Sequence, residues 1–384
     1  MQPKNTLWTQ RAWERKGLSG KIVWLLLVPF SCGFFIAVYI RNLLFSLNWR
    51  RALTLEQPVI SVGNLTVGGT GKTPTCLWLA RELERRGLRV AVLSRGYKRK
   101  AVEPLILCPS HDGSTFSENV ADAEATGDEP FMMARLYGQT VGIGRERYRV
   151  AQDVLGKSKV DVFILDDGFQ HRQLRRDVDL VLLGDDSTGW LLPSGPFREP
   201  RKALRRADYF LLTGAREEWK PFVDSVASGA CFAGSLEAVA LVGYESNLWK
   251  EYPLTLLYRS RILAVTGIAH PDGFYRFIRD YEGEIVDILE FPDHHAYSSS
   301  DWQQINRAAR AVDLIVTTEK DIVKLVRFPF ARDKLLALRV AMRVENGPVM
   351  VEAMLERIEK KFQGRGSSLH YSRTTEETSL LQRR

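Results

Sequence analysis

The sequence feature that most constrains the fold is a glycine-rich loop, VGNLTVGGTGKTP, at residues 62–74. A β-rich run, PVISVGN, begins at Pro58 and leads into the loop, and a helical pattern, KTPTCLWLARELERRG, follows it. Strand, loop and helix in this order are the context of a phosphate-binding loop, because backbone N–H groups and the helix N-terminus turn toward an anion. Thr66 replaces the first glycine of the common G-x-x-x-x-G-K-[ST] pattern. This change shifts the entry to the turn but leaves those donors.

We therefore predict that the loop binds the phosphates of a nucleotide. Lys72 adds a positive charge for the β- and γ-phosphates, and Thr73 begins the following helix. The predicted binding residues are Gly68, Gly69, Thr70, Gly71, Lys72 and Thr73. A glycine-rich turn with a lysine also occurs by chance, but the flanking strand and helix favour the phosphate site.

A phosphate loop of this kind also needs a carboxylate at the end of a nearby strand to hold magnesium. The run VDVFILDDGFQH supplies it, since residues 162–165 are apolar and Asp166 and Asp167 follow them. The alternative interpretation is an acidic turn that caps a helix. We expect both aspartates to serve the metal.

Short apolar runs alternate with helical or loop stretches along the chain, for example RVAVLSRGY, TVGIG, VDLVLLGDD and DYFLLTG. This alternation predicts an α/β fold with a parallel, helix-covered sheet of the P-loop NTPase kind. The pattern weakens between about residues 216 and 258 and restarts with RILAVTGIA. We therefore expect a second, smaller α/β domain, with a hinge before residue 258.

The expected division of the chain has four parts. They are an N-terminal membrane-associated helical segment at 1–57, a P-loop domain at 58–225, a smaller α/β domain at 226–363 and a tail at 364–384. The tail is polar and aperiodic, so we expect it to be disordered.

The N-terminal segment contains an uncharged run, IVWLLLVPFSCGFFIAVYI, at residues 22–40. As a helix it would reach roughly 28 Å, close to the hydrocarbon thickness of a bilayer. Basic residues flank it on both sides: Lys4, Arg11, Arg15, Lys16 and Lys21 before it, and Arg41, Arg50 and Arg51 after it. These charges suit anionic headgroups but leave the orientation open.

We expect this segment to associate with a membrane, either as a spanning helix or as an interfacial helix or hairpin. A buried core helix, kinked at Pro29 and Gly33, is the alternative. No A-x-A cleavage site follows the run and Arg41 ends it, which argues against a cleaved signal peptide.

The net charge of +8 suits an anionic partner, which charge alone cannot identify as nucleotide, acidic lipid or nucleic acid. The four cysteines, Cys32, Cys76, Cys108 and Cys231, are scattered without metal-ligand spacing. A disulfide framework or zinc site is therefore not expected, and a reducing cytosolic setting fits best.

A series of motifs resembles the family of tetraacyldisaccharide 4'-kinases, the lipid A kinases of Gram-negative bacteria, from the apolar helix to about residue 350. The motifs are GNLTVGGTGKTP at 63–74, SRGY at 94–97, GDEP at 127–130, DDGFQH at 166–171, PFREP at 196–200, GIAHPDGF at 267–274, FPDHHAY at 291–297 and TTEKD at 317–321. The Thr66 departure is typical of this family, so nucleotide binding stays the expectation.

The resemblance implies ATP and Mg²⁺ as cofactors, with Lys72, Thr73, Asp166 and Asp167 holding them. It implies that Asp128 of GDEP is the catalytic base for a sugar hydroxyl, paired with a histidine of FPDHH. We place that histidine at His294, and the adjacent His295 is the alternative. Read without the family, Asp128 caps the helix that starts at Pro130, and His294 is a structural turn histidine.

Further roles are implied for residues near the metal and the acceptor. Glu199 of REP resembles a metal-associated carboxylate, and Arg95, Tyr97, Gln170 and Arg198 resemble residues near the sugar and its phosphate. Arg95 lies close to Lys98, Arg99 and Lys100, so a solvated charged face is the alternative. The basic cluster Arg198, Arg201, Lys202, Arg205 and Arg206 fits either phosphates or an anionic membrane. We favour Arg198 for the site and the others for the surface.

The sequence thus predicts a membrane-associated, ATP-dependent kinase that phosphorylates the 4'-hydroxyl of the lipid A disaccharide 1-phosphate precursor. Its expected place is the cytoplasmic face of the bacterial inner membrane, with no nucleic acid and no obligate protein partner. A nucleotide switch or ATPase is the rival, although it would not need the uncharged segment at 22–40. A guanine-specific switch should also carry N-K-x-D, whereas TTEKD places Lys320 beside Asp321. A soluble sugar or nucleoside kinase fails on the same apolar segment.

Overall fold

The computed structural model describes residues 13, 15–97, 99, 103–108, 123–226, 229–246, 248–330, 334–363 and 371. The described chain forms two compact units, each built from segments that are distant in sequence. Unit 1 is drawn from Met1–Lys72, Asp167–Gly234 and Val344–Ser368, and unit 2 from Thr73–Asp166, Ser235–Arg343 and Leu369–Arg384. The expected tail at 364–384 lies outside the described residues, apart from Tyr371.

Unit 1 contains a parallel sheet. Its strands, in spatial order, are β8 (Ala230–Glu245), β7 (Tyr209–Leu212), β6 (Val178–Leu183) and β1 (Val59–Asn64). Every residue of β1 and β6 is buried, as expected where helices or loops cover both faces of a sheet. The helices of this unit are α2 (Gly17–Ser46), the 3-10 helix η1 (Arg201–Arg206), α7 (Arg216–Val226) and α11 (Gly347–Gln363).

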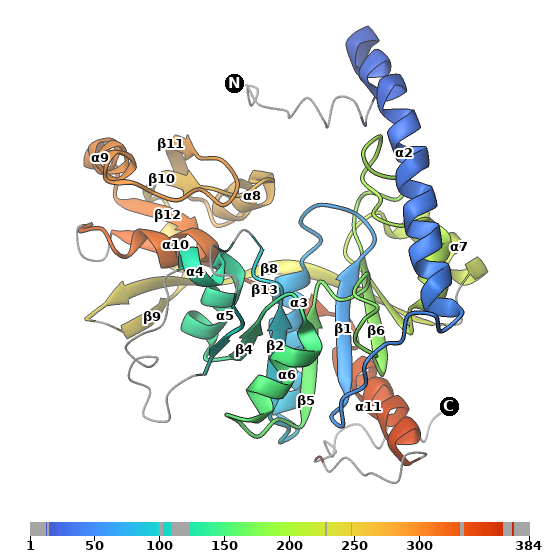
Figure 1. Ribbon diagram of the computed structural model, residues 1–384. Helices are drawn as coiled ribbons and strands as arrows, with labels where there is room; N and C mark the ends of the chain where they lie inside the picture. The colour runs from blue at the N-terminus through green and yellow to red at the C-terminus, as the bar shows by residue number, and fades with distance from the viewer. Residues whose placement is uncertain are drawn as a thin grey trace. The chain divides into compact units, whose positions relative to one another are not determined.

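Helix α2 is the long dark-blue helix of Figure 1. One side of it contacts a loop of the same unit, where Trp24 meets Trp190 edge to face at 5.1 Å and Ser31 Oγ accepts a hydrogen bond from the Ser194 N–H (3.0 Å). Leu26 and Phe30 are 66% and 68% exposed. Among the helices that the structure describes, α2 alone is long and apolar enough to cross a bilayer, and 11% of its most apolar stretch is buried. A buried core helix does not fit this exposure.

Unit 2 contains two groups of strands. The first, in spatial order, is β5 (Val162–Asp166), β2 (Val90–Ser94), β4 (Thr140–Ile143) and β3 (Leu105–Leu107), of which only β3 runs antiparallel to its neighbour. The helices in this part of the sequence are α3 (Lys72–Glu84), α4 (Ala123–Thr126), α5 (Asp128–Tyr137) and α6 (Arg147–Leu155). Strand, helix and parallel strand alternate as the sequence predicts.

The second group is parallel from β11 (Glu284–Glu290) through β10 (Arg261–Thr266) and β12 (Leu314–Thr318) to β13 (Leu335–Val344). β9 (Leu248–Tyr252) pairs antiparallel with the second half of β8. The helical elements here are η2 (Leu254–Leu257), α8 (Asp272–Asp280), α9 (Ser299–Ala308), η3 (Ala309–Ala311) and α10 (Glu319–Leu325). Ile262, Ile278, Val316 and Leu336 are buried in the core of this part.

The predicted α/β fold class, with parallel strands and an N-terminal apolar helix, is confirmed. The expected domains, 58–225 and 226–363, remain a prediction. Strand β8 begins just after the expected limit between them, and its first residues pair with β7 in unit 1 while its last residues pair with β9 in unit 2. A single strand of 16 residues therefore occupies the weakly patterned region where the sequence suggested a hinge.

Candidate functional site

The predicted phosphate loop follows β1 directly. Gly68 and Gly71 have φ angles of 122° and 83°, which side chains other than glycine rarely adopt. The Thr70 N–H donates to the Gly68 carbonyl (3.2 Å), and Asn64 Nδ2 donates to Thr70 Oγ1 (3.0 Å). A Cβ on Gly68 or Gly69 would meet no atom within 4 Å. Hydrogen bonds within the loop thus hold its shape, and the space beside Gly68 and Gly69 is open to an anion.

Segments of unit 1 from later in the sequence hold this loop. The Val67 N–H donates to the Pro196 carbonyl (2.8 Å), and the Arg198 N–H donates to the Leu65 carbonyl (2.9 Å). The structure therefore brings the PFREP and glycine-loop motifs together, which their separation in sequence conceals.

Gln170, predicted near the substrate, supports the start of the loop. Its Nε2 donates to the Asn64 carbonyl (2.8 Å), while its Oε1 is buried with no hydrogen-bond partner among the described residues. Nearby, a Cβ on Gly63 would lie 2.7 Å from Phe169, so strand β1 and the DDGFQH turn approach as closely as only glycine permits.

The carboxylate of Asp167 contacts two basic side chains beside the loop. Lys72 Nζ lies 3.6 Å from Asp167 Oδ1, and Arg198 Nη1 lies 2.8 Å from both oxygens of Asp167. Asp167 has a left-handed φ of 51°, which is uncommon for a residue other than glycine. Lys72 and Arg198 thus place two positive charges at the entrance of the phosphate loop.

Glu199 is fully buried and its oxygens are already occupied. Arg41 Nη2 lies 2.6 Å from Oε1, and Asn42 Nδ2 and Arg206 Nη2 lie 3.1 and 2.8 Å from Oε2. The carboxylate of Glu199 therefore connects the last turns of α2 to the rest of unit 1. A metal ion at Glu199 would have to displace at least one of these donors.

In unit 2, Thr73 stands in the first turn of α3 and Asp166 ends β5, and both are buried. Asp166 accepts hydrogen bonds from Ser94 Oγ (3.3 Å) and Cys76 Sγ (3.7 Å). No group of three or more His, Cys, Asp or Glu side chains with metal-site geometry occurs within the described ranges. Mg²⁺ at nucleotide sites usually takes one or two carboxylates plus waters and phosphates. A hydroxyl and a carboxylate of this kind fit it.

Asp128 has two polar partners in unit 2. His294 Nδ1 lies 3.1 Å from Asp128 Oδ2, and Lys324 Nζ lies 2.9 Å from the same oxygen. The side chains of Asp128 and Lys324 are 12% and 8% exposed. The second oxygen, Oδ1, accepts no hydrogen bond from any described residue.

Local backbone geometry places these three side chains. Asp128 is the first residue of α5 and follows Gly127, whose φ of 92° permits the sharp entry to the helix. His294 takes a left-handed φ of 61° in the turn after β11, and its N–H donates to the Gly267 carbonyl (3.1 Å). Lys324 lies one turn after Asp321 on α10, with its Nζ 3.2 Å from Asp321 Oδ1.

Burial favours the neutral form of Asp128 and by itself raises the pKa of this carboxyl. The hydrogen bond from His294 and the charge of Lys324 outweigh burial, so the pKa of Asp128 falls below its ordinary value. Asp128 therefore stays ionised and able to accept a proton in mildly acidic as well as neutral solution.

The structure separates the two adjacent histidines. His295 Nε2 lies 3.0 Å from Asp301 Oδ2, and Asp301 forms the capping box that begins α9 with Ser298. His294 instead reaches Asp128, and its ring meets that of Tyr97 edge to face at 5.6 Å. Arg95, also predicted near the acceptor, lies exposed just after β2.

Sequence reasoning missed Lys324 and the pair Arg41 and Asn42. Lys324 had a usable signal, because it follows Asp321 of TTEKD by three residues and so shares its helix face. The sequence indicated Arg41 as the end of the apolar run and as a basic residue for headgroups, but not as a partner of Glu199, to which it donates.

Comparisons with known proteins agree on one family. A sequence model of the LpxK family, described as tetraacyldisaccharide-1-P 4'-kinase, matches residues 23–359. A curated tetraacyldisaccharide 4'-kinase of Syntrophus aciditrophicus is 39% identical over 341 residues, covering 84% of this chain and 89% of its own. Its counterpart from Halothermothrix orenii is 37% identical over 335 residues, covering 81% and 85%.

A solved structure is also similar. LpxK from Aquifex aeolicus in complex with ATP is 33% identical in sequence to this chain. The two structures superpose with a TM-score of 0.73, over 88% of this chain and 99% of that one.

Proposed function

The chain belongs to the tetraacyldisaccharide 4'-kinase family, and from that premise we propose that it transfers the γ-phosphoryl group of ATP to the 4'-hydroxyl of tetraacyldisaccharide 1-phosphate in lipid A biosynthesis. One observation carries the proposal. The family match extends over residues 23–359, a range that includes the phosphate loop, Asp128 and His294.

The loop of unit 1 binds the ATP phosphates. Backbone N–H groups around Gly68 to Gly71 surround the anion, and Lys72 adds charge where negative charge builds up during transfer. The pairing of Lys72 and Arg198 with Asp167 supports this role, because the carboxylate holds both cations beside the loop before ATP arrives.

We assign Mg²⁺ to Thr73, Asp166 and Asp167, whose oxygen atoms suit this hard cation. When bound, Mg²⁺ neutralises charge on the β- and γ-phosphates. Glu199 is the weakest of the proposed metal residues, since three donors already occupy its carboxylate.

Asp128 acts as the general base. The 4'-oxygen attacks the γ-phosphorus, the bond from that phosphorus to the β,γ-bridging oxygen breaks, and the hydroxyl proton passes to Asp128. Oδ1 suits this role because His294 and Lys324 both contact Oδ2 and so orient the carboxylate without covering Oδ1. We propose that Tyr97 lines the acceptor sugar, which its 61% exposure and its contact with His294 support.

We further propose that α2 holds the enzyme on the cytoplasmic side of the inner membrane, where ATP and the lipid acceptor meet. The exposed apolar face of α2 supports this anchor. Trp190, in the loop that contacts α2, is 42% exposed, and its ring meets that of Trp24 on the helix. Helix and loop thus offer one apolar surface to the lipid.

The test is a kinase assay with purified full-length protein, labelled ATP and a panel of lipid A precursors. The proposal expects label in disaccharide 1-phosphate acceptors and none in monosaccharide lipids or nucleosides. ATP hydrolysis without transfer to any disaccharide lipid would favour the nucleotide-switch alternative.

A further inference from the structure

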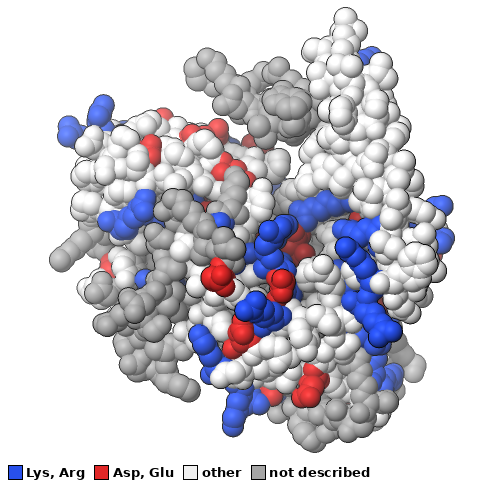
Figure 2. Space-filling view, viewed as in Figure 1, with Lys and Arg blue, Asp and Glu red and all other residues white. Residues whose placement is uncertain are grey.

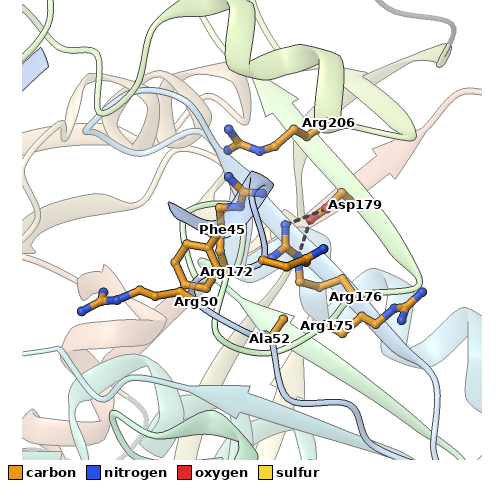
Figure 3. Close-up of a pocket in the computed structure, with 9 residues that line it drawn as sticks. Phe45, Arg50, Ala52, Arg172, Arg175, Arg176, Asp179 and Arg206 are labelled. Carbon is orange, nitrogen blue, oxygen red and sulfur yellow. Dashed lines mark hydrogen bonds and ion pairs between the residues drawn. The ribbon is translucent and has the colours of Figure 1, made fainter. Parts of the chain in front are cut away.

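A basic cavity of about 200 Å³ lies in unit 1 at the carboxyl-terminal end of α2 (Figure 3). Its charged lining residues are Arg50, Arg172, Arg175, Arg176, Arg206 and Asp179. Figure 2 shows a band of basic side chains below the nearly uncharged column of α2. We call this feature the arginine cavity. None of its residues serves the phosphate loop or the Asp128 group.

The arginine cavity carries more positive charge than its carboxylates neutralise. Arg176 Nη2 lies 2.9 Å from Asp179 Oδ2, and Arg206 Nη2 lies 2.8 Å from Glu199 Oε2. For the other three arginines, no carboxylate ion pair occurs in the part of the chain that the structure describes. A group with one or two negative charges could therefore bind these three arginines without breaking an ion pair.

Arg172 lies at the centre. Its Nη1 donates to the Asn42 carbonyl (2.9 Å), and its guanidinium lies 5.2 Å from the centre of the Phe45 ring. In Figure 3 the guanidinium groups of Arg172, Arg176 and Arg206 lie in the same part of the cavity, while Arg50 and Arg175 extend outward. Burial, and then the like charges of Arg206 and Arg176, lower the pKa of Arg172 to about 10. A bound anion would reduce the repulsion among these cations.

The rim of the cavity is apolar and exposed. Trp49, between the lining residues Asn48 and Arg50, is 78% exposed, and Leu47 and Leu53 are about half exposed. Tryptophan favours the headgroup level of a bilayer, where its ring meets lipid and its N–H meets water. The cavity also lies at the end of α2, beyond its uncharged run at residues 22–40, where the hydrocarbon region would give way to headgroups. A soluble anion would gain nothing from this rim.

We propose that the arginine cavity binds the phosphate group of an anionic glycerophospholipid headgroup. Arginine forks suit phosphate oxygens, because several N–H donors can reach one group at once. Arg172 and Arg176 would face the phosphate, and Arg50 and Arg175 would meet neighbouring headgroups. This site is separate from phosphoryl transfer, so its failure would leave the kinase proposal intact.

The experiment measures flotation of the full-length protein on phosphatidylcholine vesicles with or without added phosphatidylglycerol. Each basic side chain near an anionic surface contributes about fivefold to partition. Arg50→Gln with Arg175→Gln should therefore reduce partition onto phosphatidylglycerol vesicles by roughly 25-fold. Arg307→Gln with Arg310→Gln, an equal charge loss on exposed residues of unit 2, should leave it within about twofold.

Two substitutions at the centre separate binding from folding. Arg172→Met removes the charge and should reduce partition about fivefold, whereas Arg172→Lys keeps the charge and should retain most of it. If Arg172 only fastens α2, Arg172→Met should reduce partition equally onto vesicles with and without phosphatidylglycerol, because the lost contact is then the Asn42 hydrogen bond and not a lipid phosphate. Equal losses on both kinds of vesicle, or equal losses in the Arg50 and Arg175 double variant and in the Arg307 and Arg310 control, would overturn the proposal.

Inorganic phosphate identifies the source of the anion. It is titrated calorimetrically into the protein in zwitterionic micelles, with chloride adjusted to constant ionic strength. The proposal expects weak binding of phosphate and a clear preference for vesicles that contain phosphatidylglycerol. Tight, saturable binding of phosphate that Arg172→Met abolishes, with no such vesicle preference, would show that the occupant is a soluble anion and would refute the lipid assignment.

Discussion

The ammonium nitrogen of Lys324 lies 2.9 Å from Oδ2 of Asp128, although 196 residues separate the two in sequence. Both side chains are largely buried, so water screens their attraction only weakly. The charge of Lys324, together with the His294 hydrogen bond, keeps the proposed base ionised against the effect of burial.

Lys324→Met should therefore raise the pKa of Asp128, because burial is then less opposed. Asp128 accepts a proton only when ionised, so the acidic limb of the kcat/KM profile should move to higher pH. Lys324→Arg, which keeps the charge, should leave the limb close to that of the wild type. An unmoved limb in Lys324→Met would remove Lys324 from the proton-accepting group.

Asp128 and His294 should behave as one unit, since His294 Nδ1 contacts the carboxylate directly. Each single alanine variant should keep ATP binding and lose much of its turnover, and the double variant should be only slightly worse than the poorer single one. Steady-state kinetics of the four proteins test this cycle. Multiplicative losses would mean that the two residues act independently.

His295→Ala is the matched control for that cycle. His295 contacts Asp301 at the start of α9, so its loss should cost about 1 kcal/mol of unfolding free energy and little turnover. Denaturant melts and the same kinetic assay measure the two effects. If instead His295→Ala abolishes turnover and His294→Ala does not, the pairing with Asp128 is misassigned.

Lys72→Ala should reduce turnover by on the order of a hundredfold, because a charge aimed at the phosphates is lost. Lys220→Ala, which removes an exposed lysine from α7 of the same unit, should leave turnover unchanged. Near-normal turnover of a folded Lys72→Ala protein would exclude this loop from the active site.

Glu199→Gln distinguishes a structural role from a metal role. Arg41 and Arg206 would lose their buried carboxylate partner, so the unfolding free energy should fall by about 3–5 kcal/mol. The Mg²⁺ concentration for half-maximal rate, measured on the folded fraction at low temperature, should stay the same. A large rise in that concentration with stability intact would support the metal assignment instead.

Leu26→Glu with Phe30→Glu should release the protein from membranes, since both side chains lie on the exposed face of α2. Val349→Glu, on an exposed position of α11, is the control and should sediment with membranes as the wild type does. ATP binding should survive in both proteins. Unchanged sedimentation of the α2 variant in high salt would place the anchor elsewhere.

The sequence predicts what is local along the chain. β1, the glycine loop and the start of α3 are contiguous, so the pattern of apolar and glycine residues is enough to predict them. The contact of Asp128 with Lys324 depends on how α5 packs against α10, which no short-range pattern encodes. Likewise, FPDHH contains two adjacent histidines that the motif does not distinguish, and the structure brings His294 to Asp128 and His295 to Asp301.

Glu199 illustrates the same limit. Its sequence neighbours, Arg198 and Pro200, suggested a carboxylate of the active site, but its partners Arg41 and Asn42 come from the far end of unit 1's sequence.

The most direct test of the central claim compares tetraacyldisaccharide 1-phosphate with its 4'-deoxy analogue as acceptors for the purified protein. The account predicts one phosphate transferred per disaccharide, located at the 4'-position by phosphorus–proton correlation, and no transfer to the 4'-deoxy lipid. Asp128→Asn should abolish that transfer while ATP still binds. Phosphorylation of the 4'-deoxy analogue, or release of inorganic phosphate alone from ATP, would contradict the assignment of this chain as a 4'-kinase.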